Sequence, residues 1–274
     1  MDKQTFLGGS PNRIGRLQLI FSRRIEQNAR EKESNIILAF DFPFERMENR
    51  RRLFAKAEKI LESVHPHVCA AKFNHHLVLP LGTFDGVQKL VNKAHDFGLQ
   101  AIIDCKANDI GSTNQVIAEY YFDAGFDALI ANPFVGWDEG LEPIFRTAKK
   151  LERGVILLVY MSHRGSPEGY GQTIIDPETG SKIPQYVAFA RKAVEYKASG
   201  AVVGATYPEI ISKVHKILDE KVPIYSPGIG AQGGSIQQAL KAGSHYLIVG
   251  RKITQSANPS ETSKKIRESS RTTR

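Results

Sequence analysis

The stretch QAIIDCKANDIGSTNQVIAEYYFDAG, residues 100–125, decides the fold class of this protein. It opens on an apolar, strand-like run, QAIIDCK, and continues from Ile110 with a longer, helix-like period that ends in a glycine. The stretch therefore predicts one strand followed by one helix, which is the repeating unit of parallel sheets.

The same unit recurs along the whole chain. Seven further strand-like runs each precede a helix candidate: IILAFD (36–41), VCAAKF (68–73), DALIAN (127–132), GVILLVY (154–160), AVVGAT (201–206), PIYSP (223–227) and HYLIVG (245–250). Eight consecutive units favour a closed barrel over an open sheet, and such a barrel of about 250 residues forms one domain. We therefore predict an α/β fold, a (β/α)8 TIM barrel with an N-terminal helical extension.

Three segments are expected along the chain. Residues 1–33 form the N-terminal extension, with a helix from Arg16 to Glu33 that covers the barrel bottom or a neighbour. Residues 34–258 form the barrel, and residues 259–274 form a basic C-terminal tail. The loop from Met161 to Lys182, rich in Gly, Ser and Pro, is longer than a barrel needs and predicts a functional lid.

Composition and charge exclude several classes of protein. The chain has 274 residues, 41% of them hydrophobic, without the roughly 18-residue apolar run of a membrane span or the apolar core of a signal peptide. Its two cysteines, Cys69 and Cys105, lie in strand-like runs without a CxxC pattern, which favours a reducing, cytoplasmic location. Because the apolar span is missing, we expect no membrane partner. The formal net charge of +8 is concentrated in residues 13–30 and 264–274, where solvated helix faces and chain ends are the ordinary explanation, so we expect no nucleic-acid partner.

Charged side chains close three successive strand-like runs. Asp104 and Lys106 are two positions apart, so both fall on one face of the third strand. Asp41 ends the first strand and Lys72 lies near the end of the second, so all four are expected at one rim of the barrel. Removing such charges from water is costly, which favours a chemical role over simple surface ion pairs. Asp109, just past the third strand, caps the next helix or reaches a partner subunit.

Glycine-rich segments follow the last two strands. SPGIGAQGG (226–234) follows the seventh strand, and VGRK (249–252) follows the eighth. Backbone N–H groups next to glycine can approach an anion closely, and Arg251 adds a positive charge. Because barrels commonly bind phosphate after these two strands, the pattern predicts a phosphorylated substrate.

With these segments in order, residues 34–254 resemble the orotidine 5'-monophosphate decarboxylase family. DCKANDIGSTN (104–114) is similar to that family's DxKxxDI signature, and LAFD, AKFN, MSHRG, SPGIGAQGG and VGRKI match further blocks in order. The resemblance implies a carboxy-lyase of pyrimidine biosynthesis that converts orotidine 5'-monophosphate to UMP and carbon dioxide. It also implies that the enzyme needs no cofactor and works as a homodimer with shared active sites.

The resemblance also assigns residue roles. The implied catalytic residues are Lys72, Asp104, Lys106 and Asp109. The implied substrate-binding residues are Asp41, Ile110, Thr113, Ser162, Pro227, Gln232, Gly250 and Arg251, of which the last three would bind the phosphate. Lys106 would stabilise and then protonate a carbanion, Asp41 would hold a ribose hydroxyl, and Ser162 would meet the pyrimidine. Asp109 and Thr113 would enter from the partner subunit.

Two alternatives stay open at this point. A metal-dependent relative on the same barrel, hexulose-6-phosphate synthase or ketogulonate-phosphate decarboxylase, also carries a DxKxxD motif. Those relatives would place an acidic metal ligand near the end of the second strand, where this chain has Lys72, and no HExxH or Cys/His spacing is present, so we expect no metal site. A non-catalytic nucleotide or RNA binder that uses the basic ends is the second alternative.

Overall fold

The core of the chain is a closed barrel of eight parallel strands, seen in a computed structural model that describes residues 19–43 and 49–273. Its strands are β1 (Ile36–Ala39), β2 (Ala70–Phe73), β3 (Gln100–Ala107), β4 (Ala128–Ala131), β5 (Gly154–Tyr160), β8 (Gly200–Val203), β9 (Ile224–Pro227) and β10 (Tyr246–Val249). They pair in the order β1-β10-β9-β8-β5-β4-β3-β2, and each lies in or next to one predicted run. The predicted (β/α)8 fold is confirmed.

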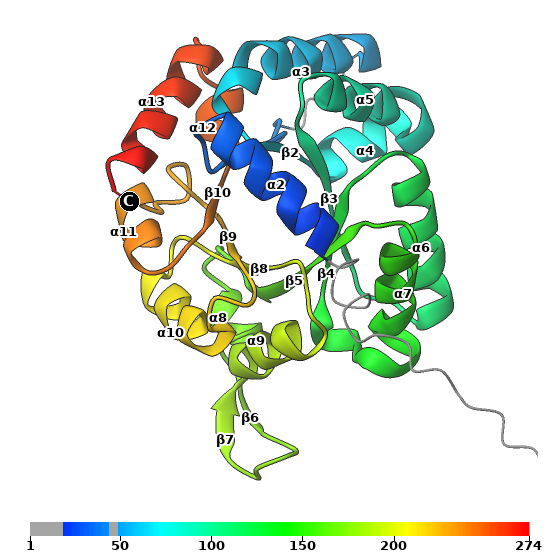
Figure 1. Cartoon of the computed structure of the whole chain (residues 1–274), viewed down its shortest axis with the longest axis vertical. Helices are drawn as coiled ribbons and strands as arrows, with labels where there is room; N and C mark the ends of the chain where they lie inside the picture. The colour runs from blue at the N-terminus through cyan, green and yellow to red at the C-terminus, as the bar shows by residue number, and fades with distance from the viewer. Residues whose placement is uncertain (1–18, 44–48, 274) are drawn as a thin grey trace, which may run out of the picture.

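Helices surround this barrel (Figure 1). Those of the wall and its loops are α3 (Arg50–Val64), α4 (His75–Leu81), α5 (Gln88–Asp96), α6 (Gly111–Asp123), α7 (Glu142–Lys150), α8 (Ser166–Gly169), α9 (Gln185–Glu195), α10 (Pro208–Leu218), α11 (Ile236–Lys241) and α12 (Arg251–Thr254). Short 3-10 or π turns are η1 (His65–His67), η2 (Gly82–Val87), η3 (Pro133–Val135) and η4 (Trp137–Leu141). Asn49, Asn74 and Ser235 cap α3, α4 and α11 by accepting backbone N–H groups. None of the described helices has the length and apolar character needed to cross a bilayer.

The barrel strands are apolar because both of their faces are covered. Every residue of β5, GVILLVY, is buried, which is the pattern of a strand between a barrel interior and a helix layer. At the lower end of the interior, the Tyr225 ring occupies the place of a side chain at Gly200, where a Cβ would lie 2.2 Å from it. The lower part of the barrel is therefore packed, and open space is left at the mouth.

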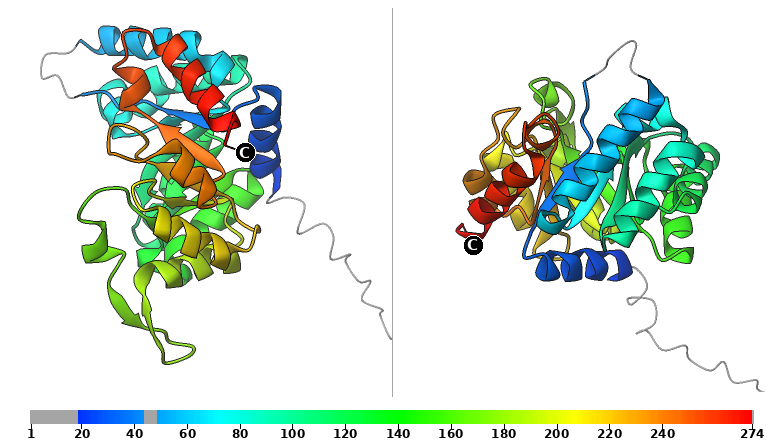
Figure 2. Two further views of the ribbon diagram at one scale, coloured as in Figure 1. Left: turned by 90° about the vertical axis from the view of Figure 1, so that its left-hand side faces the viewer. Right: turned by 90° about the horizontal axis from the view of Figure 1, so that it is seen from above.

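Helix α2 (Leu19–Glu31) lies across the barrel bottom, opposite the mouth (Figure 2). Its Phe21 and Ile25 are buried, and the Asn28 side chain donates to the backbone carbonyl of Cys69 at 3.3 Å. A Cβ on Gly154 would lie 2.5 Å from the Phe21 ring, so this strand start is shaped for the helix. The predicted N-terminal helix is confirmed within the described residues; the start predicted at Arg16 lies outside them.

The segment predicted as a basic tail is a helix, α13 (Pro259–Arg271), packed against α3, α11 and α12. Its residue Ile266 is buried, and the Asn258 side chain caps its start by accepting the backbone N–H of Glu261. Arg271 pairs with Glu33 at 2.7 Å, which joins the end of α13 to the residues just after α2. Both side chains of this ion pair are exposed to solvent, and the pair neutralises part of the positive charge of the segment.

The long segment after β5 has structure of its own. It contains α8 and a hairpin of β6 (Thr173–Ile175) and β7 (Lys182–Pro184), which projects from the barrel wall in Figure 1. Asp176 forms an ion pair with Arg191 of α9 and accepts the backbone N–H of Glu178, which holds the hairpin turn to the barrel. The segment predicted as a loop is therefore a loop only in part: residues 166–169 form a short helix, and residues 173–175 and 182 belong to strands. Elements of three or four residues leave too short a pattern to detect.

Candidate active site

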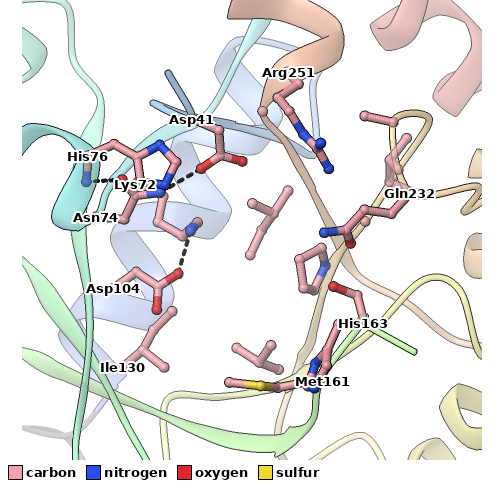
Figure 3. A pocket seen from close by; sticks show the side chains of 18 of the residues that line it. Asp41, Lys72, Asn74, His76, Asp104, Ile130, Met161, His163, Gln232 and Arg251 are labelled. Carbon is pink, nitrogen blue, oxygen red and sulfur yellow. Dashed lines mark hydrogen bonds and ion pairs between the residues drawn. The ribbon is translucent and has the colours of Figure 1, made fainter. Parts of the chain in front are cut away.

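A cavity of about 590 Å³ opens at the carboxyl ends of the barrel strands (Figure 3). The predicted site residues in its lining are Asp41, Lys72, Asp104, Lys106, Ser162, Pro227, Gln232, Gly250 and Arg251. They come from six strands and the loops that follow them, so closure of the barrel is what brings them together.

The charged centre of this cavity is an acid between two bases. The Asp104 carboxylate accepts from Lys72 Nζ at 2.5 Å through Oδ2 and from Lys106 Nζ at 2.6 Å through Oδ1. Burial favours the neutral acid, but the two ammonium groups outweigh it and lower the pKa of Asp104 to about 2. Burial opposes the charge on Lys72 as well, yet Asp104 and Asp41 raise the pKa of Lys72 above its usual value. Lys72 and Asp104 are therefore both charged at neutral pH.

Lys106 reaches the array through an unusual backbone conformation. Its φ is +51°, in the left-handed region, and the pairing of β3 with β4 shifts register between Ile103 and Ala107. A non-glycine residue there costs about 1–2 kcal/mol, and such strain gathers at functional sites. The Lys106 and Asp104 side chains do meet as predicted, but through this register shift and the positive φ of Lys106 and not through regular strand alternation.

Asp41 is held from three sides at the edge of the array. Its Oδ1 accepts from Asn74 Nδ2 at 2.5 Å, and its backbone carbonyl accepts from Thr254 Oγ1 at 2.9 Å. Gly250 lies against Oδ2, where a Cβ would come within 2.0 Å. Sequence reasoning missed Asn74 and its neighbour His76 as lining residues, although Asn74 is the last residue of the AKFN block.

The two glycine-rich segments that are predicted to bind an anion form part of the cavity wall. Gly228 and Gly230 have φ of +97° and +74°, so the turn after β9 needs glycine at both positions. A Cβ on Gly228 would lie 2.8 Å from Gln232 Oε1 and 3.0 Å from Ser162 Cβ, so these two side chains converge over that glycine. Arg251 is exposed at the start of α12, on the same side of the cavity.

The start of the segment after β5 is fixed to its neighbours. Thr206 Oγ1 donates to the Ser162 carbonyl at 2.9 Å, and Tyr207 donates to the His163 carbonyl at 3.0 Å. Ser166 Oγ donates to the Met161 carbonyl at 2.8 Å. The Ser162 backbone is therefore bonded to the loop after β8.

Three predicted site residues lie outside the cavity of their own chain. Asp109, Ile110 and Thr113 are exposed at the start of α6, and Asp109 Oδ1 accepts the N–H of Ile110 at 2.8 Å. Near them is a patch of exposed apolar side chains on α4, η2 and α6, where the Phe84 and Tyr120 rings meet at 5.9 Å. The patch comprises Leu79, Phe84, Ile110, Val116 and Tyr120, exposed by 46–76%.

The donor set of the cavity is that of an ion-pair array. The position where the metal-dependent alternative would need an acidic ligand holds Lys72, whose ammonium is bound to Asp104. Within residues 19–43 and 49–273, no three His, Cys, Asp or Glu side chains lie together as metal ligands would.

The fold and the site define a (β/α)8-barrel enzyme with a Lys-Asp-Lys array beside a glycine-rich turn. A family model described as orotidine 5'-phosphate decarboxylase / HUMPS family matches residues 34–266, and this chain belongs to that family. An orotidine 5'-phosphate decarboxylase from Methanosarcina barkeri is 35% identical over 236 residues, which cover 86% of this chain and 94% of the relative. The resemblance found in the sequence motifs is confirmed.

Solved structures agree with this assignment. The orotidine 5'-monophosphate decarboxylase of Methanocaldococcus jannaschii, complexed with the inhibitor BMP, has a TM-score of 0.71 and 31% identity, covering 86% of this chain and 97% of that one. Leishmania donovani OMP decarboxylase has a TM-score of 0.75 at 23% identity, covering 92% and 98%. The second similarity concerns the fold alone.

Proposed function

We propose that this chain decarboxylates orotidine 5'-monophosphate to UMP and carbon dioxide. The observation that carries the proposal is the array of Lys72, Asp104 and Lys106, joined by two ion pairs in a cavity whose wall also contains two glycine-rich segments. The family and its curated relatives support it. They do not favour the hexulose-phosphate or RNA-binding alternatives.

The proposed mechanism depends on Lys106. When the bond from pyrimidine C6 to the carboxylate breaks, carbon dioxide leaves and the electron pair remains on C6 as a localised carbanion. The Lys106 ammonium stabilises that charge and then transfers a proton to C6, which gives UMP. Lys72 binds Asp104 from the other side and keeps it charged and oriented.

Asp104 contributes repulsion, but repulsion alone is too small. Two like charges about 4 Å apart repel by about 4 kcal/mol at an effective dielectric of 20, whereas enzymes lower barriers by about 8–23 kcal/mol. The larger share is therefore assigned to the preorganised Lys106 and to phosphate binding energy used to close and dry the site.

The substrate is proposed to lie across the cavity from Asp41 to Arg251. Asp41 holds a ribose hydroxyl, Ser162 contacts the pyrimidine, and the phosphate binds Gln232, Gly250 and Arg251. The convergence of Ser162 and Gln232 over Gly228 supports this arrangement, because it places the base contact next to the phosphate contact. Pro227 of β9 forms part of the wall between them.

We further propose a homodimer with shared active sites. Asp109, Ile110 and Thr113 are exposed and reach no cavity of their own chain, and the apolar patch around them is of the kind that subunit interfaces cover. Asp109 and Thr113 of each subunit would enter the cavity of its partner.

The location is proposed to be cytoplasmic. Burial raises the pKa of the Cys105 thiol to about 12, which is consistent with an inert cysteine there.

Loss of orotidine 5'-monophosphate absorbance is the direct test of the function. We expect full activity after exhaustive treatment with a chelator, because the carboxylates and lysines of the site bind one another. Activity that disappears with the chelator and returns only with magnesium would reject the proposal and favour the hexulose-phosphate relatives.

The Arg251→Ala variant tests the phosphate end. We expect kcat/KM to fall roughly a hundredfold, because a charge-assisted contact far from C6 is lost. This corresponds to a loss of about 3 kcal/mol of transition-state stabilisation. Orotidine, which lacks the phosphate, is the matched control and should react equally slowly with both enzymes. A similar loss on both substrates would contradict the phosphate role.

Hydrogen exchange tests the lid. We expect residues 167–182 to exchange faster in the empty enzyme than with UMP bound, since they lie on an exposed hairpin and its approach. Residues 190–195 of α9, whose backbone N–H groups are bonded within the helix, are the internal control and should be protected in both states. Equal exchange of the hairpin in both states would remove the lid.

A further inference from the structure

We propose that Asn74 is a positioning residue that holds the Asp41 carboxylate in place for the ribose of the bound nucleotide. The inference deepens the proposed function, since it rests on a nucleotide in the cavity. Asn74 lies at the end of β2 and is the N-cap of α4, so it links the second strand to the end of the first.

The orientation of the Asn74 amide is fixed by two contacts that demand opposite ends of it. Its Oδ1 accepts the backbone N–H of His76 at 3.0 Å, which only the oxygen can do. Its Nδ2 therefore faces Asp41 and donates to Oδ1 at 2.5 Å, as the dashed line in Figure 3 shows. A helix cap thus determines which way a carboxylate of the site is held.

The contact leaves the other Asp41 oxygen on the cavity side. Oδ2 lies against Gly250, and only the absent Cβ there gives it room. Because Asn74 occupies Oδ1, Oδ2 is the oxygen left for a ribose hydroxyl. Ser162, Asp41 and Gly250 all line the same cavity.

Asn74 also gives Asp41 a hydrogen-bond partner of its own, so that Asp41 and Asp104 do not share Lys72. Lys72 is the cation whose charge Asp41 already stabilises, and its ammonium is bound to Asp104. Without the amide, Asp41 and Asp104 would compete for Lys72, and the array at the reacting carbon would lose its order. A neutral donor at position 74 gives Asp41 a partner that takes nothing from that array.

The backbone at this point is held separately. The His76 ring donates from Nδ1 to the Phe42 carbonyl at 2.5 Å. This hydrogen bond joins α4 to the backbone just after Asp41 and does not involve the side chain at position 74. Asn74→Ser retains an N-cap oxygen but is too short to reach Asp41. Asn74→Asp retains the cap and replaces the donor with a second carboxylate.

The test is calorimetric binding of UMP, 2'-deoxy-UMP and 3'-deoxy-UMP to the wild type, Asn74→Ser, Asn74→Asp and Asp41→Ala. In the wild type, loss of the hydroxyl that Asp41 holds should weaken binding, which identifies that hydroxyl. Asn74→Ser should weaken UMP binding about tenfold, as expected for losing a hydrogen bond to a charged group, and leave that deoxy analogue unchanged. Asn74→Asp should weaken UMP binding further, because two carboxylates then face each other.

A double variant separates positioning from direct contact. In an Asp41→Ala background, Asn74→Ser should have no further effect on UMP binding, because its target is gone. A remaining loss there, an equal loss on UMP and both deoxy analogues, or no loss at all would overturn the inference, as would a wild type indifferent to both hydroxyls. Hydroxyl discrimination through Asn74 without turnover of orotidine 5'-monophosphate would reject the proposed function and leave this inference standing.

Discussion

Lys106→Ala is expected to lower kcat by at least about 10⁴-fold while leaving the Kd of UMP within about tenfold, because general-acid and charge-stabilising roles are lost together. The array supports this split. Lys106 contacts Asp104 at the reacting end, whereas the ribose and phosphate ends of the cavity are formed by Asp41 and Arg251. Steady-state turnover and calorimetric UMP binding measure the two effects separately.

Two companion variants sharpen this prediction. Lys106→Arg keeps a positive charge but holds its proton too tightly to donate it, so it should remain nearly as inactive as Lys106→Ala if proton transfer matters. Lys213→Ala removes an exposed lysine of α10 and should be fully active. A Lys106→Ala enzyme slowed less than about a hundredfold would contradict the role assigned to Lys106.

Inactive Lys106→Ala and Asp109→Ala chains are expected to restore activity to each other when they are unfolded and refolded as an equal mixture. If each site takes Lys106 from one chain and Asp109 from the other, a mixed dimer has one site with both defects and one with neither. Random pairing makes about half the dimers mixed, so about a quarter of all sites should be intact. Activity per site, relative to refolded wild type, measures this fraction.

The refolded single variants are the controls for that experiment, and both should stay inactive. A mixture as inactive as either variant, beside a wild type that refolds well, would show that Asp109 acts within its own chain. Because Asp109 is exposed, a conformational change would then be needed to bring its side chain to Asp104 of the same chain.

The barrel and much of its site could be predicted from local sequence because both depend on local pattern. GVILLVY has the length and β-branched composition of a strand buried on both faces, and eight such runs separated by helices favour a closed barrel. Topology then sends every strand end to one rim, so Asp41, Lys72, Asp104 and Lys106 were placed together before any contact was known.

What only the tertiary structure decided are contacts between segments distant in sequence. The Asn74 amide meets Asp41 because the barrel brings the ends of β1 and β2 together, and nothing in the residues around Asn74 encodes its partner. The bulge that turns Lys106 toward Asp104 is likewise set by pairing with β4. Helix α2 shows the same limit, because its helical pattern was visible in the sequence but the surface that it covers is formed by strands from elsewhere in the chain. Helix α13 was predicted only as a basic tail, because Ile266 is buried by packing against α3, α11 and α12.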